Sequence, residues 1–251
     1  MMFMKKRIDV QHAGVSQIWV HRTLLEEAYR HPSKMNYFHV LSGQDYPLRS
    51  NAQFDHFFEA TDDSFMYLDS GAFRLQMESH YHRCTDEYHF NHTSTLWSRL
   101  YEKLQLGRIF RLLVRRPPIE NLCGGWDWYS WSRQTTTFVL KYLQDHPSYL
   151  QRFNHTCAGI EMIFATLLSP RAAELHIQTE NPLRYVSWHP KHPVEGSYRP
   201  YDLTSLDYDY IVDSKAFFCR KVDEVKSRRL LDQIDRQREA HYDISEHYDF
   251  V

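Results

Sequence analysis

Glu161 occupies a position in the sequence from which a carboxylate could act as a general base. It follows the turn Cys157-Ala-Gly159 and begins an apolar segment, 160–168, whose pattern predicts a helix. A carboxylate held at a rigid helix end beside a flexible glycine turn can remove a proton from a hydroxyl group. A carboxylate in the first turn of a helix also stabilises that helix through its dipole. The pattern alone favours the second interpretation, helix capping.

Aromatic side chains surround a second carboxylate, in the order Trp126, Asp127, Trp128, Tyr129, Ser130 and Trp131. Indole rings beside a carboxylate suit a sugar, because the CH faces of a pyranose stack on aromatic rings while its hydroxyls need hydrogen-bond acceptors. A strand that buries two tryptophans in the core has the same pattern. Both interpretations stay open at this point.

Two groups of residues have the types that bind metal ions. A short segment holds four histidines and a cysteine, the usual ligands of zinc: His80, His82, Cys84, His89 and His92. Their spacing matches no zinc template, and sixteen histidines in the chain make chance clustering common. The pair Asp207 and Asp209 has the letters of the DxD motif that holds a cation in many nucleotide-sugar transferases. We favour a polar loop for the first group and an acidic turn for the second.

Composition excludes several classes of protein. The 251 residues contain 30 Lys and Arg against 32 Asp and Glu, so no basic field supports nucleic-acid binding. Eight glycines argue against a glycine-rich phosphate loop, and the many aromatic residues argue against disorder. No signal-peptide core and no apolar run of about 18–20 residues occurs. Four scattered cysteines indicate reduced thiols, so we expect a cytoplasmic protein.

The coarse pattern alternates between strands and helices. We expect helices at 16–30, 51–60, 96–116, 134–144, 160–168 and 224–238, and strands at 37–41, 64–68, 129–132, 184–188 and 216–219. This alternation predicts an α/β sandwich with a mixed, mainly parallel sheet, formed as one domain over residues 1–251. Three long irregular segments are expected to build a site or to be mobile, at 70–93, 117–127 and 189–203.

Basic residues are less informative when they are taken one by one. Arg199, Arg220 and Lys221 lie in the C-terminal quarter, and nothing in their local sequence separates them from ordinary solvated cations. The helix expected at 96–116 has arginines on one face and apolar residues on the other. Such a helix fits either the protein core with a wet arginine face or an anionic membrane surface. The second possibility implies peripheral contact with the inner face of the cell membrane.

Five segments, taken in order, resemble one known family. They are LSGQDYPLRS at 41–50, GWDWYSWSR at 125–133, CAGIEMIFATL at 157–167, NPLRYVSW at 181–188 and SKAFFCRKVD at 214–223. Together they are similar to the Core-2/I-branching enzymes, glycosyltransferase family 14, which also contains the peptide O-xylosyltransferases. The resemblance extends from about residue 12 to residue 234. It implies a GT-A-like three-layer sandwich.

The resemblance also implies a reaction. Enzymes of this family transfer a sugar, of the N-acetylglucosamine or xylose type, from a UDP-sugar to an acceptor hydroxyl with inversion. The family's catalytic base falls on Glu161, which reverses the capping interpretation. Two basic residues of the family neutralise the diphosphate without a divalent metal or other cofactor, and they fall on Arg199 and Lys221.

The same resemblance places sugar-binding residues and shows three departures from the family pattern. Asp45, Asp127 and Trp128 are expected to line the acceptor or donor sugar. Ile160 stands where the family has an aspartate, and Val222 stands where it has a phenylalanine. The β-α-β unit that holds the uridine in the family has almost no counterpart, so the fold is expected to be shortened at its N-terminus.

Three hypotheses follow from the sequence. The first is an inverting glycosyltransferase of bacterial surface-polysaccharide assembly, with a carbohydrate or lipid-linked saccharide as acceptor. The second is a non-catalytic or partner-dependent carbohydrate-binding remnant of the family, suggested by the shortened N-terminus. The third is a metalloprotein built on the histidine-rich segment. We adopt the first.

Overall fold

The computed structural model describes residues 7–83, 119–154, 156–188 and 200–246, together with residue 4 and a few single positions between 96 and 106. The described helices are α1 (Val15–Tyr29), α2 (Asn51–Glu59), α3 (Ala72–Arg83), α6 (Arg133–Asp145), α7 (Pro147–Gln151), α8 (Ile160–Leu168), α9 (Tyr208–Asp213) and α10 (Arg228–Glu246). The described strands are β1 (Tyr37–His39), β2 (Asp45–Pro47), β3 (Ser64–Asp69), β4 (Gly124–Ser132), β5 (Ile177–Gln178), β6 (Arg184–Val186) and β7 (Phe218–Arg220).

These strands form two mixed sheets. The larger sheet has the order β1-β4-β3-β5, and the smaller sheet has the order β2-β7-β6. The α/β class and the mixed sheet are thereby confirmed, and the arrangement is consistent with a GT-A-like domain. The expected majority of parallel pairs is wrong for the described strands. Strand β4 runs antiparallel to both of its neighbours and β2 runs antiparallel to β7, which leaves parallel pairing to β3–β5 and β6–β7.

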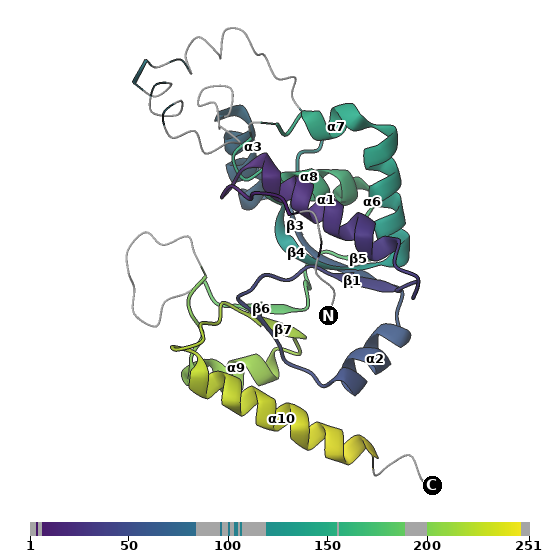
Figure 1. Ribbon diagram of the computed structural model, residues 1–251, viewed down its shortest axis with the longest axis vertical. Coiled ribbons are helices and arrows are strands. Elements are labelled where there is room, and N and C mark those ends of the chain that lie inside the picture. Colours follow the sequence, from purple (N-terminus) through teal and green to yellow (C-terminus); the bar gives the residue numbers. More distant parts are fainter. Residues whose placement is uncertain are drawn as a thin grey trace.

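The layers follow from which faces are apolar. Helices α1, α6 and α8 cover one face of the larger sheet (Figure 1). On its other face, Phe65 of β3 packs with Phe217, Phe218 and three phenylalanines of α2. This second cluster joins the larger sheet to α2 and to the smaller sheet. The far side of the smaller sheet is buried against α9 and α10. The single domain expected over 1–251 stays a prediction.

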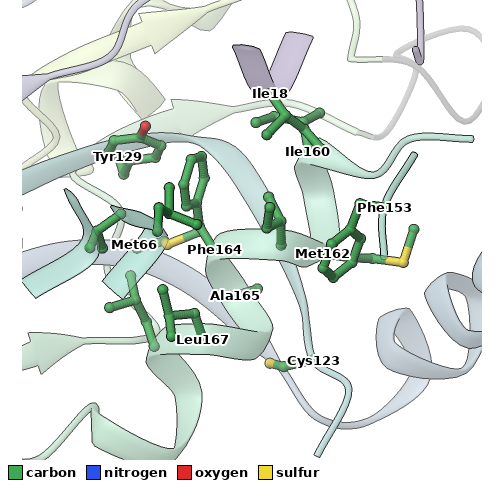
Figure 2. Close-up of a cluster of buried hydrophobic side chains, with 14 of the residues drawn as sticks. Ile18, Met66, Cys123, Tyr129, Phe153, Ile160, Met162, Phe164, Ala165 and Leu167 are labelled. Atoms are coloured by element: carbon green, nitrogen blue, oxygen red, sulfur yellow. The ribbon is translucent and has the colours of Figure 1, made fainter. Parts of the chain in front are cut away.

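Helix α8 lies at the centre of the main core. Eight of its nine residues are buried, and Glu161 is the exception. Figure 2 shows its side chains between β3 and β4 on one side and α1 on the other, with Phe164 near Tyr129 and Ile160 near Ile18. An apolar run with almost no polar face forms a helix that is buried all round. This explains why the expected range 160–168 agrees with the structure.

Local hydrogen bonds define the beginnings of two other helices. Ser50 begins α2 with a capping box, in which its hydroxyl accepts from the backbone N–H of Gln53 and the Gln53 side chain accepts from the Ser50 N–H. Ser132 caps α6 by accepting from the backbone N–H of Thr135. Such caps satisfy backbone donors that have no partner within the helix. Both helices lie within one or two residues of the expected ranges.

Several segments differ from expectation. Part of the expected irregular segment 70–93 is the helix α3, which buries Met77 and Tyr81 one turn apart. Most residues of this segment are polar, so its narrow apolar stripe was not recognised in the sequence. Strand β4 begins at Gly124, earlier than expected. Helix α10 begins at Arg228 because the Asp223 carboxylate accepts from the N–H groups of Val225 and Lys226, which holds these residues in a turn.

Within the described ranges, no helix combines the length and the apolar character that crossing a membrane requires. The helix expected at 96–116 lies outside the described residues, apart from single positions. Peripheral membrane contact and cytoplasmic location therefore stay predictions.

Gly125 allows β4 and α8 to approach each other closely. A Cβ atom built at this position would lie 2.8 Å from the Cβ of Ala165 on α8 and 2.8 Å from the carbonyl oxygen of Tyr67 on β3. Real side chains do not tolerate such distances, and two of the neighbouring atoms belong to rigid elements. The glycine therefore sets the spacing between the strand and the helix that carries Glu161.

We predict that Gly125→Ala destabilises the protein by about 1–3 kcal/mol, because the added methyl group overpacks the α8–β4 contact. Urea denaturation followed by circular dichroism measures the change. Gly43→Ala is the matched control, since a Cβ at that position meets no atom within 4 Å. Equal unfolding midpoints for the two variants would contradict the prediction.

Candidate active site

Glu161 lies at the first turn of α8, next to a left-handed turn. Ala158 has a φ of 53°, and its N–H donates to the carbonyl of Ala13 before α1, at 2.8 Å. This bond fixes the point where the chain enters α8. Within the described structure, the Glu161 carboxylate has no hydrogen bond or ion pair, and the residue is half-buried. Glu161 lies in the first turn of α8, where its charge also suits the helix dipole, so the structure leaves both interpretations of this residue open.

An irregularity in β4 brings a second carboxylate toward Glu161. Met66 pairs with Tyr129 and Leu68 pairs with Gly125, so two steps along β3 face four steps along β4. The additional residues of β4 form a bulge at 126–128. Bulges leave residues outside the hydrogen-bonded ladder and reorient their side chains, and they are frequent beside active sites. This bulge carries Asp127 and Trp128.

The two carboxylates influence each other. Burial, the larger cause, and the negative charge of Asp127 together raise the pKa of Glu161 to about 7. Burial also raises the pKa of Asp127, whereas the positive charge of Arg220 opposes that shift. A carboxylate that titrates near neutral pH can accept a proton and release it again. Glu161 therefore has the electrostatics of a general base.

Asp45 and Arg220 form a buried ion pair across the smaller sheet. They are paired residues of β2 and β7, and Asp45 Oδ1 lies 3.1 Å from Arg220 Nη1. Their side chains are 1% and 9% exposed. The other oxygen, Oδ2, accepts from the Ser42 N–H at 2.6 Å. Asp45 thus orients Arg220, and its expected contact with a sugar stays a prediction.

Arg220 also contacts Trp128. Its guanidinium carbon lies 3.3 Å from the centroid of the indole ring, which is a cation–π contact between β7 and the β4 bulge. Trp128 is half-buried and lies near Trp126, which in turn lies near Tyr67 and Trp188. A row of aromatic rings therefore adjoins the bulge that carries Asp127. Trp131 of the same motif is fully buried in the core, whereas Trp126 and Trp128 are half-buried, so the motif has a core part and a part that a ligand can reach.

Arg184 is a further buried cation that sequence reasoning did not assign to the site. From β6 it donates to the carbonyls of Val40 and Tyr129, at 3.1 and 2.9 Å, and so joins the two sheets. Burial lowers the pKa of Arg184 to about 10, which leaves it charged at neutral pH. Its charge acts on Asp45 and Asp127. The one sequence signal that could have indicated this role is the position of Arg184 at the start of an apolar strand.

The two cations expected to bind a diphosphate have different outcomes. Arg199 lies outside the described residues. Lys221 follows Arg220 at the end of β7, and its ammonium group lies 3.5 Å from Asp202 Oδ1. Asp202 also pairs with Lys226. Lys221 is about one-third exposed, so its charge is accessible to a ligand but is already partly balanced.

One of the two expected metal-type groups can be compared with the structure. The histidine-rich group lies outside the described residues, apart from the backbone of α3. In the other group, Asp207 accepts from the N–H of Thr204 at 2.8 Å and caps the turn before α9, as an acidic turn would. A third group was not expected: Asp62, Asp63 and His176 place ligand-type atoms within 4.8 Å of one another at the surface. Exposed groups of this kind are common without an ion.

We predict that Asp127→Asn lowers the pKa of Glu161 below about 7, because it removes a neighbouring negative charge. The pKa should stay above its ordinary value, since burial, the larger cause, is unchanged. Carbon-13 NMR of the labelled Glu161 carboxyl group, recorded against pH, measures the shift. Asp55→Asn, which neutralises an exposed carboxylate on α2, is the control. An unchanged titration in Asp127→Asn would show that the two groups are not coupled.

Comparison with known proteins identifies the family. The sequence matches the Core-2/I-branching enzyme family over residues 1–212. The matched range contains Asp45, Asp127, Trp128 and Glu161 and ends before Lys221. A comparison with curated proteins finds no match to the chain. Because the family match spans most of the sequence, the chain belongs to the Core-2/I-branching enzyme family, whose members are glycosyltransferases.

Proposed function

We propose that this protein is an inverting glycosyltransferase in which Glu161 is the general base. The observation that carries the proposal is the state of Glu161: its carboxylate is half-buried, has no partner among the described residues, and has a pKa raised to about 7. A carboxylate without a partner in a partly desolvated position has its proton-accepting oxygen available to a substrate.

The proposed reaction is a single displacement. The acceptor hydroxyl loses its proton to Glu161 while its oxygen forms a bond to C1 of the donor sugar. The bond between C1 and the phosphate oxygen breaks, and its electron pair leaves with UDP. The row of aromatic rings around Trp126 and Trp128 would hold the sugar rings, whose CH faces stack on indole. Asp127 would accept hydrogen bonds from sugar hydroxyls.

The leaving diphosphate gains negative charge, which nearby cations would stabilise. We propose Lys221 for this role, together with Arg199, and no divalent metal. Asp202 holds the Lys221 ammonium group at 3.5 Å, while Lys226 binds the other oxygen of Asp202. Lys226 could therefore keep Asp202 neutralised when Lys221 turns toward a diphosphate.

The proposed substrates follow from the family. The donor is a UDP-sugar of the N-acetylglucosamine or xylose type, and the acceptor is a carbohydrate or a lipid-linked saccharide. Bacterial surface-polysaccharide synthesis, at the inner face of the cell membrane, is the proposed setting. The aromatic rings beside Asp127 support a saccharide in the site, because they offer flat apolar surface next to a carboxylate acceptor.

We predict that Glu161→Gln lowers the rate of sugar transfer by about 10²–10⁴-fold, because the amide cannot accept the proton. The affinity for UDP, measured by calorimetry, should change little. Glu174→Gln, on an exposed carboxylate that pairs with Arg171, is the control and should keep full activity. A Glu161→Gln enzyme that keeps more than about a tenth of the rate would refute the assignment of the base.

We also predict that the rate of transfer falls as the pH drops through about 7. Protonated Glu161 cannot act as a base, and its pKa sets this acidic limb. The limb should move to lower pH in Asp127→Asn, in the same direction as the NMR titration of Glu161. A profile that is flat between pH 5 and 8 would be inconsistent with Glu161 as the base whose ionisation limits the rate.

A further inference from the structure

Arg220 occupies an unusual position between the two sheets. Its backbone belongs to β7 of the smaller sheet, whereas its guanidinium lies over Trp128 in the β4 bulge of the larger sheet. The side chain is 9% exposed, so the contact is largely desolvated. Cation–π contacts are strongest under this condition. The contact between Arg220 and Trp128 is therefore expected to be stronger than a cation–π contact at the exposed surface.

One carboxylate forms an ion pair with the guanidinium, and a second acts on it through its charge. Asp45 lies opposite Arg220 in the β2–β7 ladder, and its second oxygen is fixed by the Ser42 N–H. The charge of Asp127 also favours the charged form of Arg220. The Nε and Nη1 nitrogens of Arg220 are buried and have no hydrogen-bond acceptor among the described residues. The ion pair and the indole ring are consequently the main partners of this cation.

The guanidinium covers one face of the Trp128 indole. At 3.3 Å from the ring centroid it leaves no room for another group on that side. Trp126 meets the ring at a tilt of 59° with 5.7 Å between centroids, so it does not stack on the opposite face. Trp128 remains half-buried rather than fully buried. The ring therefore has one face covered by Arg220, and on the other face no aromatic ring of the described residues is stacked.

We propose that Arg220 is a positioning residue that fixes Trp128 as a one-sided platform for a saccharide ring. Asp45 anchors Arg220, Arg220 fixes the plane of the indole, and the remaining face of the indole receives the CH face of the sugar. This inference deepens the proposed function and rests on a saccharide being its substrate. It assigns Arg220 to the orientation of a binding residue and gives it no part in proton transfer.

The first test examines the orientation of Trp128 without any ligand. Protein labelled with ¹⁵N-tryptophan gives indole N–H signals in NMR, and Trp128→Phe identifies the signal of Trp128. In Arg220→Met this signal should move more than the other indole signals. Arg133→Met is the matched control, because it removes a cation that lies 4.3 Å over Tyr29 on α1, outside the site. A Trp128 signal that stays in place in Arg220→Met would overturn the proposal.

The second test measures saccharide binding with chitobiose, N-acetyllactosamine and xylobiose as probes. Addition of at least one probe should shift the Trp128 signal of the wild-type protein, and Arg220→Met should weaken that binding by about 3- to 30-fold. If none of the three sugars shifts the signal, or if Arg220→Met binds as tightly as wild type, the platform is refuted. The signal reports binding alone, so an inactive protein whose Trp128 responds to sugar would contradict the proposed reaction and leave this inference standing.

Two further variants separate positioning from folding. Arg220→Met leaves Asp45 buried without its ion-pair partner, which is strongly destabilising. The double variant Asp45→Asn with Arg220→Met removes both charges and keeps an acceptor for the Ser42 N–H. Arg220→Lys keeps a positive charge for Asp45 but lacks the flat guanidinium. It should recover thermal stability and still bind sugar weakly, with a raised KM and a nearly unchanged kcat. Wild-type sugar affinity in Arg220→Lys or in the double variant would overturn the proposal.

Discussion

The contact between β4 and α8 is the constraint on which the site depends. Gly125 lets the strand approach Ala165 so closely that no side chain fits between them. The other residues of α8 are buried around this contact, and they leave Glu161 as the residue of the helix that is not buried. The same strand then departs from its ladder with β3 and projects Asp127 beside the helix. One close approach thus brings a carboxylate from each element into a common environment.

Carboxylates and arginines meet where the two sheets adjoin. Glu161 and Asp127 carry negative charge on the side of the larger sheet, and Arg184 and Arg220 provide positive charge from the smaller sheet. Asp45 balances Arg220 from within the same sheet. Buried charges need such partners, because desolvation otherwise makes them costly. Arg220 and Arg184 oppose the upward pKa shift of Asp127, whereas burial and Asp127 both raise the pKa of Glu161 and no cation among the described residues opposes them.

The parts of the fold that the sequence predicts well are those governed by local pattern. The helix at 160–168 follows from an uninterrupted apolar run, and α2 begins at a capping serine that is visible in the letters. Helix α3 was not expected, because its stripe of Met77 and Tyr81 is hidden among polar residues. The prediction of a mainly parallel sheet was also wrong for the described strands. Strand direction depends on long-range topology, which the periodicity of the sequence does not encode.

The candidate site divides in the same way. Glu161, Asp127 and Trp128 could be named from residue type and family resemblance. Arg184 and Arg220 could not be distinguished from solvated arginines, because their roles arise from contacts between sheets that are distant in sequence. Lys221 was chosen over its neighbour Arg220 by resemblance, whereas the structure buries Arg220 beside the carboxylates and leaves Lys221 with Asp202.

The bulge in β4 has a consequence for how such a protein can diversify. Residues 126–128 lie between the paired positions Gly125 and Tyr129, so they contribute side chains without contributing to the ladder with β3. Their chemistry can change while the register of the strand is kept. Under the proposed function, variation at these three positions would change the lining of the sugar site and leave the strand ladder intact. The same separation makes the bulge a suitable place to redesign specificity.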